Sequence, residues 1–421
     1  MVTVNGYFIF VLVTVVGFFL LDFFSRMMNL GALKPELPSA FADVFDAAEY
    51  SKSQDYTREG TRFGLIEDTV SLLIFLAFWW MGGFGWVDAQ VRNIVAENTI
   101  LQGLLFIAFL YVGSTLISLP FELYDTFVTE EKFGFNKMTI GTFFADKAKG
   151  LLLAIVLGAP ILALIFFLFD TFESYAWLYG WIAMAGFSLL ITYLAPTYIM
   201  PLFNKFKPLE DGELKTAIQE MSQKCQFPLT EVYEIDGSKR STKANAFFTG
   251  FGKNKKIALY DTLIQNNGVG ELVAVLAHEI GHFKKKHIMQ SMVLGILQMG
   301  VLFFLLGLFL NKRGLFEAFG VENVSVYGSL VFFTFLFEPV SKLLSVVMMV
   351  LSRKNEYEAD AYAAEVTGRP EDLISGLKKL SKDNLSNLTP HPFYVFLNYS
   401  CLLYTSPSPR DQRGSRMPSS A

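Results

Sequence analysis

Charged residues are scarce in this chain. Of its 421 residues only 18% are Asp, Glu, Lys or Arg, against about 25% in an ordinary protein, while 52% are hydrophobic and 43 are Phe. The apolar content excludes an intrinsically disordered chain. So few charges cannot cover the surfaces of the roughly two or three soluble domains that this length would give. The composition therefore indicates an integral membrane protein.

Cysteine and histidine are also rare. The chain has two Cys, Cys225 and Cys401, which excludes a disulfide scaffold. It has only four His, so a motif that contains two of them is an uncommon chance event. The net charge of −4 gives no reason to expect nucleic acid as a partner.

Stretches without Asp, Glu, Lys or Arg predict the membrane spans, because a helix that crosses a hydrocarbon core of about 30 Å needs about 20 apolar residues. Six such stretches qualify: 1–21, 69–87, 98–121, 150–169, 174–204 and 288–311. The first lacks the basic start and the cleavage site of a signal peptide, so we expect it to be retained. A seventh candidate, 324–350, contains Glu338 and Lys342 on one helix face. These two residues either line a water-filled cavity or form an ion pair between packed helices.

Lysine and arginine gather in alternate loops. Loops 22–68 and 122–149, the segment 205–287 and the chain after 351 are rich in them, whereas the intervening loops carry at most two. Loops rich in these residues face the cytoplasm. We therefore expect an outside N-terminus, with 205–287 and the C-terminus in the cytoplasm.

The longest segment without a span has the pattern of a small α+β module. Its apolar spacing predicts a helix over 214–224 and short strands around 232–235, 244–251 and 256–260. The fold class we expect is an all-α polytopic membrane protein that carries this module. Its parts are five N-terminal membrane helices (1–204), the α+β module (205–287), helices six and seven (288–350), a C-terminal segment (351–400) and a tail (401–421).

The motif H-E-x-x-H occurs in the module as His278, Glu279 and His282. Four positions on a helix place both imidazoles on one face, where they can bind Zn²⁺, and the Glu can act as general base on a water. His287 lies off this face, so we expect it at a helix end, with an outer contact to the site as the alternative.

A catalytic zinc needs a third protein ligand. Downstream of span seven, Glu356 is a good candidate for this ligand, and Glu358 and Glu365 are the alternatives on the same helix. Asp360, one turn after Glu356, is placed to accept a hydrogen bond from a ligand His.

Taken together, these motifs resemble those of the type I CAAX prenyl proteases, which are seven-span membrane zinc endopeptidases. The resemblance covers about residues 60–400. It is carried by segments 119–139, 200–215, 241–264, 278–282, 352–363 and 392–400.

The resemblance implies seven helices that enclose a water-filled chamber. It implies one zinc ion, held by His278, His282 and Glu356, with Glu279 as the catalytic residue and Asp360 beside a ligand. Three further residues match the family's substrate-binding strand: Asn245, Ala246 and Phe247. The expected partners are membrane lipid and a peptide or protein substrate, which family members take in prenylated form and shorten by three residues.

The tail departs from the family. Residues 404–421 are rich in Ser, Pro and Arg and show no periodicity. We therefore expect 401–421 to lie outside the family sequence and to replace its His-Pro and Arg segment.

Two other functions compete with CAAX processing. One is a membrane-protein quality-control protease of the heat-shock zinc protease type, and the other is a transporter or scaffold with a structural metal. The sequence is compatible with a bacterial inner membrane or with the endoplasmic reticulum.

Overall fold

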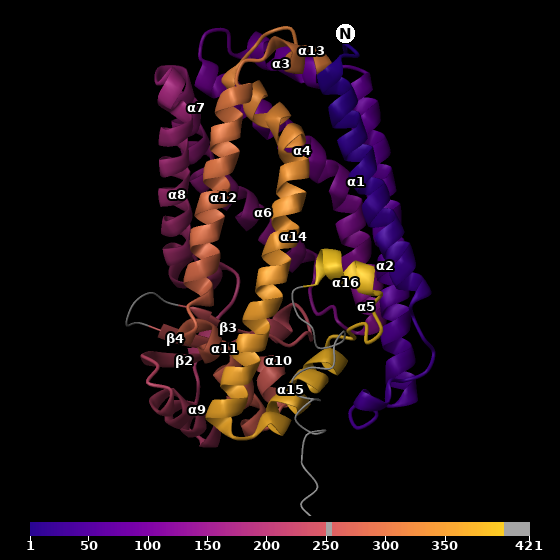
Figure 1. The fold of residues 1–421 in the computed structure, drawn as a ribbon, viewed down its shortest axis with the longest axis vertical. Helices are drawn as coiled ribbons and strands as arrows, with labels where there is room; N and C mark the ends of the chain where they lie inside the picture. Colours follow the sequence, from indigo (N-terminus) through magenta and orange to yellow (C-terminus); the bar gives the residue numbers. More distant parts are fainter. Residues whose placement is uncertain (250–254, 400–421) are drawn as a thin grey trace, which may run out of the picture.

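The computed structural model describes residues 1–249 and 255–399 and is mostly helical (Figure 1). In this part of the chain seven helices are long and apolar enough to cross a membrane, which confirms the predicted number of spans. They are Gly6–Gly31, Ala47–Trp80, Thr99–Phe133, Ile140–Thr171, Ala176–Leu202, His287–Phe309 and Val326–Thr367. The segments 250–254 and 400–421 are outside the described residues, and so is the predicted tail 401–421.

Several spans consist of more than one helix, joined by short π or 3-10 turns. The helices that form spans are α1 (Gly6–Gly31), α2 (Ala47–Trp80), α4 (Thr99–Tyr124), α5 (Glu130–Phe133), α6 (Ile140–Leu153), α7 (Ala159–Thr171), α8 (Ala176–Leu194), α12 (His287–Phe309) and α14 (Val326–Thr367). The π turns are Asp125–Thr129, Ala154–Gly158 and Ala195–Ile199.

The helix ends differ from the predicted span ends. Segment 22–68 was expected to be a loop, but α1 continues to Gly31 and α2 begins at Ala47, where Asp46 caps the helix. The predicted span 69–87 is also divided, because Gly82 turns the chain in the left-handed region (φ 78°) and starts α3 (Gly83–Ile94). Charge-free stretches thus locate the spans, but they miss the charged turns that extend a helix beyond the membrane.

An aromatic cap closes the end that carries the N-terminus. There α3 and α13 (Arg313–Ala318) lie across the ends of the long helices (Figure 1). Phe319 stacks on Phe332 of α14 at 4.3 Å and on Trp79 of α2 at 5.2 Å. The Trp79 indole N–H donates to the Ala318 carbonyl at 2.8 Å. This packing explains part of the high Phe content.

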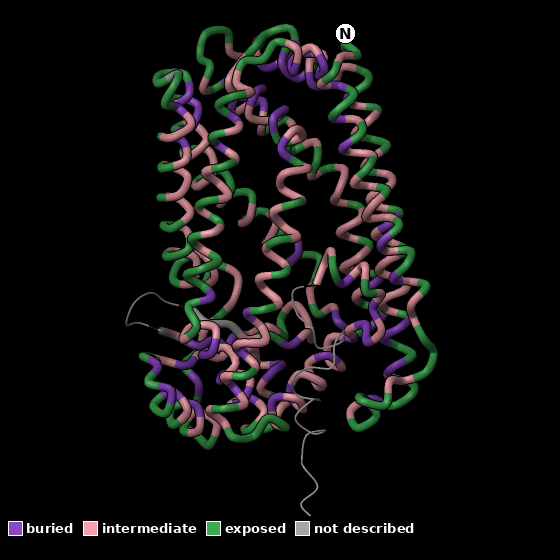
Figure 2. Tube along the Cα trace, viewed as in Figure 1, coloured by how far each residue is buried: buried purple, intermediate pink, exposed green. Residues whose placement is uncertain are grey.

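Buried residues gather in this cap and in the module at the opposite end, whereas the middle of the spans is partly or fully exposed (Figure 2). In each spanning window only 6% to 22% of the residues are buried within the protein. Most residues of the spans are therefore left to face lipid or the space between the helices, and only a minority are packed inside the protein. Glu338 is exposed, and no ion pair joins it to Lys342 within the described segments. The structure therefore does not show the alternative ion pair, and the polar cavity face stays a prediction.

The module contains a four-stranded sheet of order β1-β2-β4-β3. Its strands are β1 (Phe206–Pro208), β2 (Leu229–Ile235), β3 (Ala246–Thr249) and β4 (Lys255–Tyr260). Three of these strands and the helix α9 (Glu213–Lys224) agree with the sequence prediction, whereas β1 was missed because three residues show no alternation. β2 and β4 pair in parallel, and the outer strands β1 and β3 pair antiparallel to them.

One helix connects this sheet to the membrane part. α11 (Val269–Lys284) packs Leu272 and Leu276 against the sheet residues Ile257 and Leu259. Its other face packs against α14 and α15. The remaining helices of this end are α10 (Asp261–Asn266), α15 (Pro370–Asp383) and α16 (Pro392–Asn398).

Candidate metal centre and active site

The helix α11 has a well-anchored start. Glu271 lies in its first turn and accepts hydrogen bonds from the Gly268 N–H at 2.8 Å, the Ser375 hydroxyl at 2.5 Å and the Lys379 ammonium at 2.7 Å. Burial alone would raise the pKa of Glu271, but these three donors hold it below its usual value. A carboxylate near the N-terminus also interacts favourably with the helix dipole. The anchor fixes the helix that carries the H-E-x-x-H motif.

Three predicted ligands converge between α11 and α14. Nε2 of His278 lies 3.2 Å from Nε2 of His282 and 3.4 Å from Oε2 of Glu356. Nε2 of His282 lies 3.7 Å from Oε1 of Glu356. One ligand atom from each residue fits within a group whose members are at most 4.8 Å apart.

The spacing of these atoms fits a zinc ion. Bonds of about 2.0–2.1 Å in tetrahedral geometry place ligand atoms about 3.3 Å from one another. The imidazole Nδ1 of His278 lies 2.9 Å from Oδ1 of Asp360, so in the neutral ring Nδ1 carries the proton and the lone pair of Nε2 can bind a metal. The chemistry of the donor set also suits zinc, because imidazoles and a carboxylate with a fourth position left open are typical of catalytic sites.

A glycine lets the two helices approach. A Cβ atom on Gly281 would lie 3.1 Å from both Cα and the carbonyl oxygen of Ala359, closer than ordinary contact. This residue therefore sits where α11 and α14 cross with little space between them. Glu356 and Asp360, on either side of Ala359 along α14, are thereby brought to the His pair. Glu365, an alternative ligand in the sequence, is exposed and outside this group.

The carboxylates and the histidines strongly affect each other's protonation. Burial lowers the pKa of His278, but the Asp360 and Glu356 carboxylates outweigh burial and raise it to about 9. Burial and the neighbouring His278 lower the pKa of His282 to about 4. Burial raises the pKa of Glu279, the Glu356 carboxylate adds to the rise, and His278 opposes it. Perturbed pKa values concentrated in this way are typical of catalytic sites.

The structure places His287 closer to the site than we expected from the sequence. Lys286 adopts the left-handed conformation (φ 60°) as the N-cap of α12 and turns the chain from α11 into that helix. His287, the first residue of α12, then lies with Nδ1 3.0 Å from Nδ1 of His282, and it is only 4% exposed. The expected helix-end position is correct, and the alternative of an outer contact to the site also holds. The contact depends on the left-handed turn at Lys286, and the hydrophobic pattern of the sequence gives no sign of such a turn.

The predicted substrate-binding residues lie at an open sheet edge. Ala246 and Phe247 pair with Leu259 and Ala258 of β4, and Asn245 immediately precedes the strand. In the described sheet β3 is the last strand, so its other edge has no strand partner.

The segment that leads into β3 is held by polar contacts. Asn384 accepts from the Ala244 N–H at 3.2 Å and donates to the Ala244 carbonyl at 3.4 Å. The Lys243 ammonium lies 2.9 Å from both the Glu130 carboxylate and the Tyr56 hydroxyl. These contacts, which the sequence did not reveal, tie the start of β3 to α15, α5 and α2.

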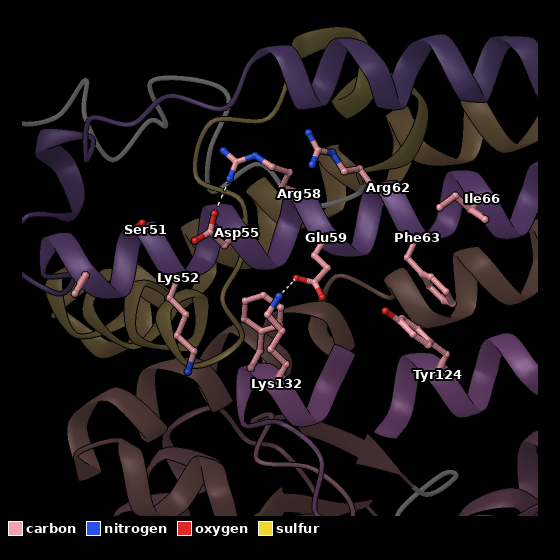
Figure 3. A pocket seen from close by; sticks show the side chains of 12 residues that line it. Ser51, Lys52, Asp55, Arg58, Glu59, Arg62, Phe63, Ile66, Tyr124 and Lys132 are labelled. Carbon is pink, nitrogen blue, oxygen red and sulfur yellow. Dashed lines mark hydrogen bonds and ion pairs between the residues drawn. The ribbon is translucent and has the colours of Figure 1, made fainter. Parts of the chain in front are cut away.

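A separate cavity of about 780 Å³ lies beside the charged half of α2. Two ion pairs cross its lining, Arg58 with Asp55 and Lys132 with Glu59, while Phe63 stacks on Tyr124 (Figure 3). None of the three candidate metal ligands lines this cavity. The site is therefore not part of it.

Comparison with known proteins agrees with this geometry. Residues 26–205 match the family model described as CAAX prenyl protease N-terminal, five membrane helices, and residues 208–411 match peptidase family M48. The second match includes part of the segment 401–421, and the expectation that this tail lies outside the family stays a prediction.

Relatives from several kingdoms align over most of their length. A protein named CAAX prenyl protease 1 homolog from Oryza sativa is 38% identical over 377 residues, which cover 88% of each chain. CAAX prenyl protease 1 of Saccharomyces cerevisiae is 35% identical over 87% of this chain and 86% of its own. The Homo sapiens homolog is 33% identical over 86% and 85%.

A solved structure is similar over nearly the whole chain. The crystal structure of S. mikatae Ste24p aligns with a TM-score of 0.88 and 33% identity, covering 94% of this chain and 97% of that one. The chain therefore belongs to peptidase family M48 and is a multi-pass membrane metalloendopeptidase of the CAAX prenyl protease type.

Proposed function

We propose that this protein is a zinc-dependent endopeptidase that removes the C-terminal tripeptide of prenylated C-a-a-X proteins. The observation that carries the proposal is the convergence of His278, His282 and Glu356, with their ligand atoms at most 4.8 Å apart, beside the acidic residue Glu279. We place the enzyme in the endoplasmic reticulum with its module in the cytoplasm. The eukaryotic origin of the relatives and the loops rich in Lys and Arg support this location.

The proposed metal site holds one zinc ion per chain, with His278, His282 and Glu356 as its ligands. When bound, zinc supplies a positive charge that polarises the scissile carbonyl and makes water acidic enough to react near neutral pH. Asp360 accepts from Nδ1 of His278 and so fixes the tautomer in which Nε2 is free.

Glu279 is the proposed general base. It follows the first ligand directly, and burial raises the pKa of its carboxyl group toward the range in which it can exchange protons at neutral pH. Glu279 takes a proton from the attacking water and delivers it to the nitrogen of the leaving peptide. The same carboxyl group thus acts first as base and then as acid.

The substrate is proposed to lie in extended form along Asn245, Ala246 and Phe247. An open strand edge offers backbone hydrogen bonds to an extended peptide independently of its side chains. Asn384 supports this role, because its amide holds both backbone groups of Ala244 as a neighbouring strand would. We infer that Asn384 keeps the edge strand in register.

Cleavage assays distinguish the candidate functions. The purified full chain is incubated with a farnesylated C-a-a-X peptide and with its unprenylated twin, with and without 1,10-phenanthroline, and Glu279→Gln is the matched inactive variant. Chelator-sensitive release of the tripeptide, with preference for the farnesylated peptide, supports the proposal. Equal cleavage of both peptides would favour quality-control proteolysis, and zinc content without cleavage would favour a transporter or scaffold.

A further inference from the structure

A chain of hydrogen bonds extends from the candidate metal site to the surface of α14. It begins at Nδ1 of His282, which lies 3.0 Å from Nδ1 of His287, and continues from Nε2 of His287 to Oε2 of Glu358 at 3.2 Å. The Lys354 ammonium lies 3.7 Å from the other Glu358 oxygen. Three helices, α11, α12 and α14, thus contribute one residue or more to a single polar row.

Because the two histidines of this row are largely buried, each of their N–H groups needs a hydrogen-bond acceptor within the protein. His287 is 4% exposed, and the His282 side chain is 18% exposed. A buried imidazole N–H that loses its acceptor is costly, because water cannot replace the lost hydrogen bond. Both ring nitrogens of His287 have partners, so its position is set from two sides.

If His282 binds a metal through Nε2, the direction of every hydrogen bond in the row follows. Nδ1 of His282 must then carry the proton and donate it. Nδ1 of His287 must accept, which leaves the proton of the neutral His287 ring on Nε2. That N–H donates to the Glu358 carboxylate, which can only accept.

The Nδ1 atoms of the two ligand histidines are therefore held in different ways. Nδ1 of His278 contacts the Asp360 carboxylate directly at 2.9 Å, whereas Nδ1 of His282 contacts the imidazole of His287, which in turn contacts the Glu358 carboxylate. Residues that orient a ligand His typically affect metal affinity by about 10–100-fold.

We infer that His287 is a positioning residue that fixes the tautomer and ring orientation of His282, and that Glu358 in turn orients His287. This inference rests on the proposed function, because it takes His282 as a zinc ligand. The inference assigns a role to the row His282, His287 and Glu358. Glu358 contacts His287 from the face of α14 that does not carry Glu356 and Asp360. Glu358 is thus a supporting residue rather than a competing ligand.

The test measures zinc affinity directly. The dissociation constant of the purified full chain is determined by competition with a chromophoric chelator, and zinc release is followed after addition of excess chelator. His287→Leu removes the acceptor for His282, and we expect zinc affinity to fall about 10–100-fold with faster release. Glu358→Leu should weaken zinc binding to a smaller extent, because His287 then loses only its outer partner.

Conservative variants separate positioning from general damage. In His287→Asn the amide oxygen can still accept from Nδ1 of His282 while the amide N–H₂ can still donate, so affinity should return to within a few-fold of wild type. Glu358→Gln keeps an oxygen acceptor and should also bind zinc nearly normally. His391→Leu is the matched control, because His391 accepts from the Phe393 N–H at the start of α16, away from the row.

The outcomes are distinct. If wild type binds no stoichiometric zinc, the proposed function fails. If wild type binds zinc but His287→Leu and wild type share the same affinity and release rate, the positioning role is overturned. Equal loss in His287→Leu and His287→Asn would also overturn it, since the retained acceptor would then be irrelevant. Loss in the Leu variant with recovery in the Asn variant supports the inference.

Discussion

The crossing of α11 and α14, the two helices that carry the candidate site, can be tested at Gly281. In Gly281→Ala the new Cβ would lie 3.1 Å from Cα and from the carbonyl oxygen of Ala359, and 3.2 Å from Cδ1 of Tyr362. Ordinary contacts are about 3.5–4.0 Å, so α14 must retreat by about 0.5 Å. The hydrogen bond from His278 to Asp360, now 2.9 Å, would stretch to about 3.4 Å, beyond the usual range of about 2.7–3.2 Å.

The displacement predicts a specific loss of activity. A misplacement of 1 Å can cost about 100-fold in rate, so about half of that displacement should cost about tenfold in kcat/KM. Overpacking costs about 1–3 kcal/mol of stability, whereas replacing Gly by Ala in a helix interior returns about 1 kcal/mol. The variant should therefore be at most about 2 kcal/mol less stable and remain folded while its activity and zinc affinity fall.

A second glycine provides the matched control. Gly376 lies on α15, which also packs against α11, but a Cβ there would meet Glu271 Cβ at 3.4 Å and Val275 Cγ2 at 3.5 Å, which is ordinary contact. Gly376→Ala should leave kcat/KM unchanged and raise the unfolding temperature slightly. Peptide cleavage, zinc affinity and thermal unfolding are measured for both variants. Wild-type activity and zinc affinity in Gly281→Ala would refute the claim that this crossing sets the ligand geometry.

Further predictions concern individual side chains. Glu279→Gln should keep one zinc per chain and lose at least about 100-fold in kcat, whereas His278→Ala should lose both, as shown by metal analysis and cleavage. Asn384→Ala should raise KM several-fold with a smaller change in kcat, because it loosens the edge strand. A KM equal to that of wild type would contradict this. The pKa of Glu271 is lowered in the folded state, so its contribution to stability is present above the unfolded pKa and is lost as the pH falls through the folded value. Wild type should lose unfolding temperature as the pH falls from neutral to below the usual pKa of Glu271, and Glu271→Gln should lose less. If both proteins lose the same amount, the anchor at Glu271 does not cause this acid sensitivity.

The sequence predicted the membrane spans better than it predicted their ends. A stretch without charges must cross the hydrocarbon, which makes the existence of a span a strong inference. The first part of α2, from Ala47, carries Lys52, Asp55, Arg58 and Glu59 and was therefore assigned to a loop. Its helical state is set by the cap at Asp46 and by packing, and neither is visible in a search for apolar residues.

In the candidate site, too, the features set by local helix geometry were predictable from the sequence, whereas those set by tertiary packing were not. Spacing on one helix was enough to pair His278 with His282, because their relation depends only on helix geometry. The choice among Glu356, Glu358 and Glu365 depended on the resemblance to known proteases. In the structure the face of α14 that meets Gly281 brings Glu356 to the His pair and supports its proposed role, and such a crossing is a tertiary property. His287 required a left-handed Lys286, which no periodicity encodes.

The arrangement of the proposed ligands also links the module to the membrane part. His278 and His282 belong to the helix that packs on the sheet, whereas Glu356 belongs to α14, whose 42 residues also reach the aromatic cap at Phe332. At about 1.5 Å per residue, Glu356 lies about 36 Å along the helix from that cap. A ligand that binds only the assembled state stabilises it by about 4 kcal/mol when present at 1,000 times its dissociation constant. A bound ion would therefore hold α11 against α14 near their crossing at Gly281, and the residues proposed to position the ligands, Asp360 and His287, would stabilise this junction as well as the chemistry.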